Sequence, residues 1–221
     1  VSGQAVTLSV DVALQALIEQ SFADHRGAAV VLQPRTGEVL AMVSAPGFDP
    51  QAFADQRGDA IRQAMQDERS VMMNRATRGA YLPGSIVKPL SGATALESGV
   101  VTPHTSFTCP GYVEFGDRRI RCWKRDGHGP VNLRDALMWS CNVYFMEVGR
   151  RLGLDRLRTG LGAAGFGRRS GWPLGEAAGH LPTRRMSEGE VAMLAMGQGE
   201  ILITPLQVAV MVSAIANGGW L

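Results

Sequence analysis

The apolar positions in the first part of the chain follow two patterns, first alternation with polar residues and then helical spacing. Residues 6–10 alternate between apolar and polar and predict a short strand, and apolar residues at helical spacing follow over residues 14–22. Two apolar runs, 28–32 and 38–44, lie on either side of the Pro-Arg-Thr-Gly sequence at 34–37. Because proline and glycine suit a tight turn, we expect these two runs to pair as an antiparallel hairpin.

Helical spacing then dominates, with one further hairpin. Apolar residues predict a helix from about 59 to 74, and we expect its apolar stripe to pack in the core: Ile61, Met65, Val71 and Met72. A second helix is expected to begin near residue 85 and to end near Gly99. Strand-like runs at 112–115 and 119–122 predict a second hairpin.

The chain beyond the loop at 126–130 reads as helices. Glycines are expected to divide it into short helices and turns: Gly149, Gly153, Gly160, Gly162, Gly165 and Gly167. A capping box at 187–190 and the pair Thr204-Pro205 predict two helix starts, and Asn217-Gly218 predicts a stop.

Composition narrows the class of protein. The chain has 221 residues and is 45% hydrophobic, enough for one sizeable core. A net charge of +2 does not favour nucleic acid as a partner. The densest basic run is more typical of a solvated hairpin face than of a phosphate-binding track: Arg118, Arg119, Arg121, Lys124 and Arg125. Without a charged leader or an apolar run of roughly 20 residues, the chain is expected to be an excised or mature segment.

Ser85 and Lys88 lie three residues apart at the start of the second predicted helix, just after Pro83-Gly84. This spacing places a hydroxyl and an amine on one face of the first turn. If burial keeps Lys88 neutral, its amine can accept the Ser85 proton, and Ser85 becomes a nucleophile. The alternative is a capping serine followed by a solvated lysine, and the spacing alone does not distinguish the two.

A second pattern, Ser-x-Asn, occurs at Ser140 and Asn142 between two predicted helices. Ser-x-x-Lys followed by Ser-x-Asn resembles the acyl-serine transferase superfamily of penicillin-binding proteins and serine β-lactamases. Further segments match a class B penicillin-binding protein transpeptidase domain in family order: 28–43, Asn74-Arg75-Ala76, 81–85, Gly197-Gln198-Gly199 and 204–207. The resemblance covers essentially the whole chain and is strongest to the elongation type, penicillin-binding protein 2.

The resemblance implies an α+β fold of the transpeptidase and serine β-lactamase type. We expect an incomplete copy, in which residues 1–45 carry the hairpin of the central sheet and 59–219 form a mainly helical lobe with a hairpin insert near 107–123. It also implies a DD-transpeptidase that acts on the D-Ala-D-Ala ends of peptidoglycan stem peptides and is acylated by β-lactam antibiotics. Such an enzyme is expected on the periplasmic, extracytoplasmic face of the inner membrane, with a membrane glycosyltransferase of the elongation machinery as a partner.

Carried over by position, the resemblance assigns roles to four side chains. Ser85 is expected to be the nucleophile, and Lys88 its general base. Ser140 is expected to relay a proton toward the leaving amine. Asn142 is expected to hydrogen-bond the amide on the acyl side of the substrate.

The third motif of the family, Lys-Thr-Gly or Lys-Ser-Gly, is absent from the sequence. We therefore expect a chain truncated before that motif, with negligible activity of its own. Rapid stoichiometric acylation of Ser85 in the isolated segment would contradict this. Two alternatives stay open: a serine β-lactamase or DD-carboxypeptidase, and a non-catalytic penicillin-sensing or scaffold domain.

Three cysteines and one histidine form a separate candidate site: Cys109, Cys122, His128 and Cys141. Three thiolates and an imidazole are a complete ligand set for structural zinc. The alternative is a Cys109-Cys122 disulfide with Cys141 as a small buried residue. Relatives of the penicillin-binding protein 2 type have a zinc site here, with acidic residues among the ligands. No cofactor is expected for the chemistry itself.

Tryptophans near these motifs are expected to serve packing. Trp123, Trp139 and Trp172 are interpreted in this way, although Trp139 is adjacent to Ser140 and can border the cleft.

Overall fold

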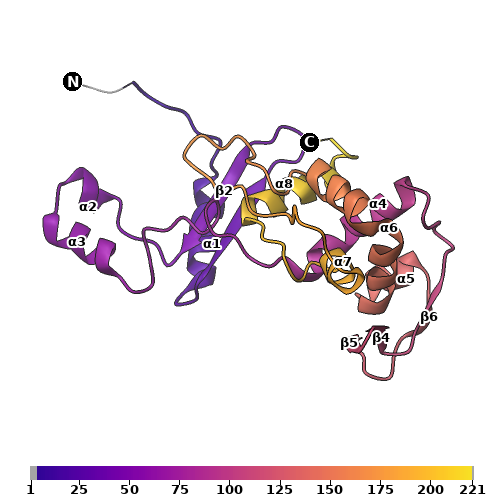
Figure 1. The fold of residues 1–221 in the computed structure, drawn as a ribbon. Helices are drawn as coiled ribbons and strands as arrows, with labels where there is room; N and C mark the ends of the chain where they lie inside the picture. The colour runs from indigo at the N-terminus through magenta and orange to yellow at the C-terminus, as the bar shows by residue number, and fades with distance from the viewer. Residues whose placement is uncertain (1–3, 221) are drawn as a thin grey trace. The chain divides into compact units, whose positions relative to one another are not determined.

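The computed structural model describes residues 4–220, which form two compact units (Figure 1). Within the described residues, the first unit comprises 4–80, 169–178 and 204–220, and the second comprises 81–168 and 179–203. Helices accompany antiparallel strand pairs in the chain, so the predicted α+β class is confirmed. No helix within residues 4–220 combines the length and the apolar character needed to cross a membrane.

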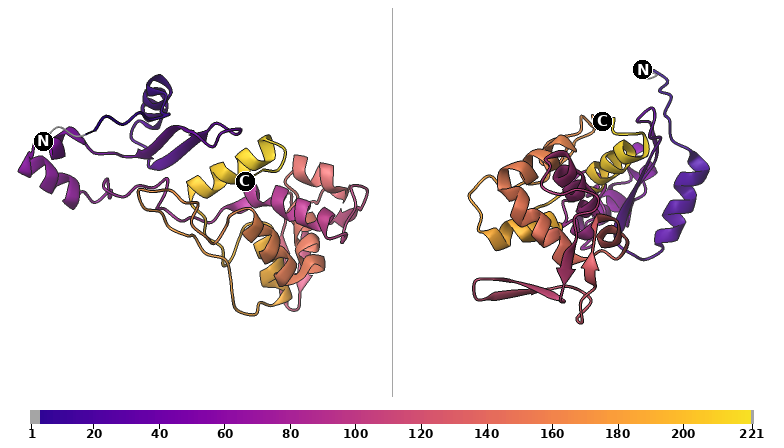
Figure 2. Two further views of the ribbon diagram at one scale, coloured as in Figure 1. Left: turned by 90° about the horizontal axis from the view of Figure 1, so that it is seen from above. Right: turned by 90° about the vertical axis from the view of Figure 1, so that its right-hand side faces the viewer.

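The first unit is built on the predicted hairpin. Strand β1 (Gly27–Leu32) pairs with β2 (Val39–Ala45), from Gly27 opposite Ala45 to Val31 opposite Ala41. Helix α1 (Val12–Phe22) packs against β2, and helix α8 (Pro205–Ala216) packs against β1. Figure 2 shows the two helices on opposite faces of the hairpin. The hairpin is therefore covered on both faces, although it has only two strands.

The strand predicted at residues 6–10 does not form. Val6 and Leu8 are 79% and 72% exposed, and the contacts with the neighbouring strand are isolated: Ser9 Oγ donates to Val39 O at 2.8 Å, and the N–H of Asp11 donates to Leu40 O at 2.9 Å. A segment in which apolar and polar residues alternate forms a strand only if its backbone groups can hydrogen-bond to a neighbouring strand. This segment does not pair in that way, so it stays irregular.

The helix predicted from 59 to 74 is much shorter. Helix α3 ends at Gln66 (Gly58–Gln66) and follows the short helix α2 (Gln51–Ala54). The Asp67 carboxylate accepts the N–H of Arg69 at 2.8 Å, a local turn that competes with further helix. Met65 is 71% exposed, so the expectation that the whole stripe packs in the core was wrong.

The second unit is organised around helix α6 (Asn142–Ala163), which lies against α4 (Lys88–Glu97) and α7 (Glu188–Ala195) (Figure 1). The prediction that glycines divide this stretch is confirmed at Gly153 (φ +72°), a non-helical residue at which two helical parts of α6 meet, whereas Gly149, Gly160 and Gly162 lie inside the helical parts. Other glycines permit close packing. A Cβ on Gly160 would lie 2.0 Å from Thr94 Oγ1, and one on Gly149 would lie 2.6 Å from Ala195 Cβ.

Two short strand pairs lie beside these helices. The predicted hairpin is confirmed as β4 (Tyr112–Phe115) and β5 (Arg118–Arg121). A second pair, β3 (Phe107–Cys109) and β6 (Gly129–Val131), was not predicted. Three-residue strands that contain Gly129 and Pro130 show no alternation that could indicate them. Helix α5 (Leu133–Met138) follows β6 and leads to α6.

Candidate active site

Ser85 lies on a short 3₁₀-helix, η1 (Gly84–Val87), which continues directly into α4. The turn is fixed by a backbone contact: Gly84 N–H donates to Gly197 O at 2.8 Å. A Cβ on Gly197 would lie 2.0 Å from the Gly84 carbonyl oxygen, so this approach requires glycine. The result is an exposed Ser85 three residues before Lys88, which is only 2% exposed.

Ser140 and Asn142 come from the junction between α5 and α6. Asn142 is the first residue of α6, and Cys141 is its N-cap. Ser140 has a φ of +50°, in the left-handed region that non-glycine residues seldom adopt. Strain of this kind is concentrated at functional sites, where the side chain must face one direction.

The structure brings the four predicted residues into one hydrogen-bonded chain. Lys88 Nζ donates to Ser140 Oγ at 2.9 Å, to Ser140 O at 2.8 Å and to Asn142 Oδ1 at 2.7 Å. Ser140 Oγ donates to Ser85 Oγ at 3.0 Å. Within the described residues no direct hydrogen bond joins Lys88 to Ser85, so Ser140 is the link between amine and hydroxyl.

Burial keeps a larger fraction of the Lys88 amine neutral, and so able to accept a proton, than in an ordinary lysine. Desolvation lowers the Lys88 pKa from 10.5 to about 8, while the neighbouring Cys122 and Cys141 oppose the shift. The Phe145 ring lies 5.6 Å from Nζ and contributes to the apolar surroundings. A fraction of the molecules therefore carries a neutral amine near pH 7, and a proton can pass along the chain from Ser85 through Ser140 to Lys88.

A cysteine cluster lies directly behind this chain of residues. Its ligand atoms all lie within 4.8 Å of one another: Cys109 at the end of β3, Cys122 after β5, His128 before β6 and Cys141. All three cysteines are buried free thiols, so the alternative of a Cys109-Cys122 disulfide is not formed.

The cluster geometry fits tetrahedral zinc. Bonds of about 2.3 Å to sulfur and 2.0–2.1 Å to nitrogen imply S···N separations of roughly 3.6 Å. His128 Nδ1 lies 3.5 Å from Cys109 Sγ and 3.6 Å from Cys122 Sγ. His128 Nε2 is buried without a hydrogen-bond partner, which leaves Nδ1 as the nitrogen that faces the sulfurs.

The protonation states of the cluster are compatible with metal ligation. Burial, followed by the charges of Lys124 and Lys88, lowers the His128 pKa and keeps the ring neutral. Burial opposes ionisation of Cys122, but hydrogen bonds from backbone N–H groups outweigh it and lower the Cys122 pKa. Burial raises the pKa of Cys141, the most enclosed thiol, so a bound cation would be needed to hold it as a thiolate.

The tryptophans beside the site differ from the packing expectation. Trp123 is 63% exposed and Trp139 is 40% exposed. Trp123 Nε1 donates to Trp139 O at 2.9 Å. The His128 ring stacks on Trp139 at 5.9 Å and meets Trp123 edge-on at 5.2 Å. The sequence signal for this arrangement was only the position of Trp139 next to Ser140.

Comparisons with known proteins agree with the geometry. Residues 27–221 match the model of the penicillin binding protein transpeptidase domain. The chain is 36% identical over 230 residues to the peptidoglycan D,D-transpeptidase MrdA of Acinetobacter baumannii, covering 98% of this chain and 34% of that protein. It thus spans about a third of the length of that curated relative.

Solved structures of penicillin-binding proteins are also similar to this chain. The crystal structure of Pseudomonas aeruginosa PBP2 in complex with WCK 5153 has a TM-score of 0.87 and 36% identity, over 95% of this chain and 51% of that chain. PBP2 of Helicobacter pylori, in its complex with MreC, has a TM-score of 0.86 and 31% identity, over 95% and 42%.

Proposed function

Since the chain belongs to the penicillin binding protein transpeptidase domain family, we propose that it supplies the acyl-serine centre of a peptidoglycan DD-transpeptidase. The hydrogen-bonded chain from buried Lys88 through Ser140 to exposed Ser85 carries this proposal. It combines a base of lowered pKa, a relay and an accessible hydroxyl, which are the parts that an acyl transfer to serine needs.

In the proposed reaction Ser85 Oγ attacks the carbonyl carbon between the two D-alanines of a stem peptide. The C–Oγ ester bond forms, the C–N bond breaks, and the terminal D-Ala leaves as an amine. The proton lost by Ser85 passes through Ser140 to Lys88, and a proton returns through Ser140 to the leaving nitrogen. An acceptor amine then attacks the ester, a new amide forms, and Ser85 regains its proton.

Asn142 has a positioning role in this proposal. Its Oδ1 accepts from Lys88 Nζ at 2.7 Å, which leaves the amide NH₂ group to face a ligand or the backbone. Asn142 Nδ2 lies 3.5 Å from Arg121 O, a long contact that a substrate carbonyl can replace. This supports a role in binding the amide on the acyl side of the substrate.

Zinc in the cysteine cluster is a second part of the proposal. Cys109, Cys122, His128 and Cys141 would hold the ion, which would act structurally because four protein ligands leave no open position. Since Cys141 lies between Ser140 and Asn142, a ligand bond at its sulfur would fix the backbone that presents both side chains. The S···N separations at His128 support this assignment.

The partners and the location follow from the family. We propose that β-lactam antibiotics acylate Ser85, that a membrane glycosyltransferase of the elongation machinery assembles with the protein, and that the domain works on the extracytoplasmic face of the inner membrane. The similarity to MrdA and to PBP2 structures supports these assignments.

A fluorescent penicillin tests the acyl-serine chemistry in the full-length protein that contains this chain. We expect covalent labelling of the wild type and none of Ser85→Ala. Ser98→Ala, which removes an exposed hydroxyl at the end of the same helix, is the matched control and should label normally. Equal labelling of Ser85→Ala would contradict the proposal.

The products made from a stem pentapeptide and an amine acceptor distinguish transpeptidase from the alternatives. Mass spectrometry should detect the cross-linked amide. Hydrolysed tetrapeptide alone would indicate a DD-carboxypeptidase, and rapid turnover of nitrocefin would indicate a β-lactamase.

A further inference from the structure

Trp123 and Trp139 form an exposed aromatic surface, here called the tryptophan platform, directly beside Ser140. Their orientation is fixed by the hydrogen bond from Trp123 Nε1 to Trp139 O and by the His128 ring between them. A large indole that is 63% exposed yet held in one orientation loses little entropy when it binds a ligand. Exposed, ordered tryptophan is typical of binding surfaces.

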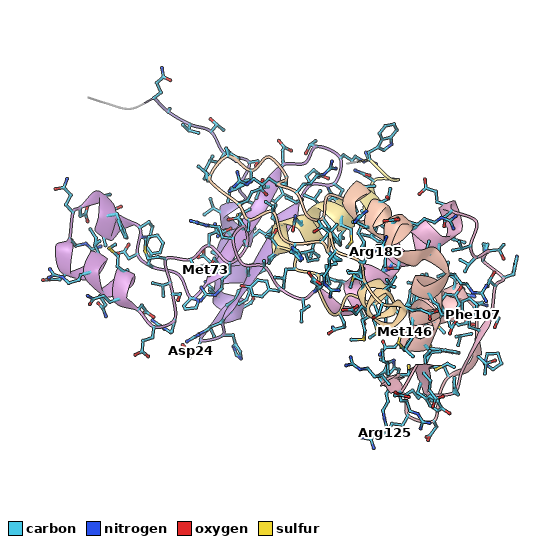
Figure 3. All side chains as sticks on the ribbon, viewed as in Figure 1. Asp24, Met73, Phe107, Arg125, Met146 and Arg185 are labelled. Atoms are coloured by element: carbon cyan, nitrogen blue, oxygen red, sulfur yellow. The ribbon has the colours of Figure 1, made fainter. Side chains whose placement is uncertain are left out.

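Three cations lie within two residues of Trp123 in the sequence. Arg121, Lys124 and Arg125 are all exposed, and the acidic side chain among them is Asp126. Within residues 4–220, none of the three cations forms an ion pair, whereas Arg119 on the same hairpin is paired with Glu114. Figure 3 shows Arg125 at the outer edge of the second unit. Three cations against one carboxylate give this edge a positive charge that is complementary to an anionic partner.

The position of Ser140 indicates which part of the substrate meets this surface, provided that the proposed function holds. Ser140 returns the proton to the amine that leaves. The acceptor amine must approach the ester carbon along the path by which that amine left, because bond formation retraces bond breaking. The surface next to Ser140 therefore belongs to the acceptor side of the reaction.

We propose that the tryptophan platform and the cations Arg121, Lys124 and Arg125 bind the acceptor stem peptide. Such a peptide carries free carboxylates and an aliphatic side chain that ends in the attacking amine. The carboxylates pair with the cations, and the aliphatic part lies on the indole rings, which directs the amine toward the Ser85 ester. The amine nitrogen bonds to the ester carbon, the C–Oγ bond breaks, and the nitrogen's proton reaches Ser85 Oγ through Ser140.

The opposite face of the hairpin supplies a matched control. Arg118 and Ile120 line a pocket of about 870 Å³ together with residues at the start of α7. Side chains alternate across a strand, so Arg118 lies on the face opposite Arg119 and Arg121. Arg118→Glu reverses a charge on the same hairpin without altering the tryptophan platform or its cations.

The experiment uses the full-length protein with a small acyl-D-Ala thioester donor, so that the acyl-enzyme forms without a large donor strand. Two acceptors are compared: a stem tetrapeptide with free carboxylates and the same peptide with its carboxylates amidated. Lys124→Glu/Arg125→Glu, both at exposed positions, should raise the KM for the carboxylate acceptor about tenfold and remove its advantage over the amidated acceptor. Trp123→Ala should raise the KM for both acceptors.

Penicillin acylation separates this inference from the function on which it rests. Arg118→Glu should be acylated by penicillin within about twofold of the wild-type rate, since Arg118 lies outside both the proposed active site and the tryptophan platform. For the other variants the acceptor KM is measured on the acyl-enzyme that forms, so a change in the acylation rate does not enter it. If the acceptor KM stays within twofold in both the charge-reversal and the Trp123 variants, the acceptor assignment is wrong while the acyl-serine function stands. If the wild type is not acylated at all, the proposed function and this inference both fail.

Discussion

The hydrogen-bonded chain of the proposed active site and the cysteine cluster lie on opposite sides of one three-residue segment, and their chemistry differs accordingly. Ser140 and Asn142 face Lys88, and their side-chain oxygen atoms accept hydrogen bonds from Lys88 Nζ at 2.7–2.9 Å. Cys141 between them is fully buried and faces sulfur and imidazole. The first side needs mobile protons, whereas the second needs a fixed geometry. A buried cluster at this position would stabilise the strained backbone at Ser140 without touching a substrate.

Loss of the cluster is expected to have the largest effect on this arrangement. His128→Ala should lower bound zinc from about one equivalent to well below one, and destabilise the protein by on the order of 3 kcal/mol or more, because buried thiols lose their shared cation. For a domain of this size that corresponds to a fall in Tm of roughly 6–12 °C. Metal analysis by mass spectrometry and thermal unfolding measure both effects.

His25→Ala is the matched control, because His25 is exposed and its ring Nδ1 lies 3.1 Å from the backbone carbonyl of Phe22. Its zinc content and Tm should equal those of the wild type. Wild-type protein purified without chelator that contains no near-stoichiometric zinc would contradict the metal assignment.

The catalytic side predicts a pH dependence of moderate size. Burial lowers the Lys88 pKa to about 8, so the neutral amine increases as pH rises through that value. The rate of acylation by penicillin should increase about tenfold from pH 7 to pH 9, from about one-tenth to about nine-tenths neutral amine. Stopped-flow measurement of acylation over this range tests the prediction, and a flat profile would contradict it.

The lowered pKa of Lys88 also determines how its contribution to the free energy of unfolding changes with pH. The folded pKa of Lys88 lies below the unfolded value of 10.5, so the unfolded chain binds more protons between about pH 8 and 10.5. The contribution of Lys88 to the free energy of unfolding therefore increases with pH in that window.

The sequence predicted those parts of the site that depend on short spacings. Ser85 and Lys88 are close because a helical start places residues three apart on one side, and the Ser-x-Asn pattern lies at a helix junction as expected. The hairpin of β1 and β2 was also readable from its turn residues. Each of these features depends on residues that are close in the sequence, so the local sequence pattern was sufficient to predict it.

Features that depend on particular side-chain contacts, some local and some distant in the sequence, were not predicted. The helix expected at 59–74 stops early because of a side-chain turn at Asp67, and α6 continues past glycines that pack against Thr94 and Ala195. The exposure of Trp123 depends on the loop that carries His128, which no residue spacing specifies. The ends of these helices and the exposure of these side chains depend on which surfaces pack together. The composition of the chain and the spacing of its apolar residues do not directly specify that packing.

The backbone strain at Ser140 is expected to give the smallest difference in stability among these predictions. Ser140→Ala and Ser140→Gly both remove the hydroxyl that links Lys88 to Ser85, so each should lower the acylation rate about 10²-fold. The two differ at the backbone, where φ is +50°. Glycine adopts that conformation at no steric cost, so Ser140→Gly should be more stable than Ser140→Ala by roughly 0.5–1 kcal/mol in denaturant unfolding.

At Ser91, inside α4, the same pair of substitutions should show the reverse order, because alanine is the better helix former. If Ser140→Gly is instead the less stable of the two, the left-handed backbone is not a source of strain. The cysteine cluster would then have no strained loop to stabilise.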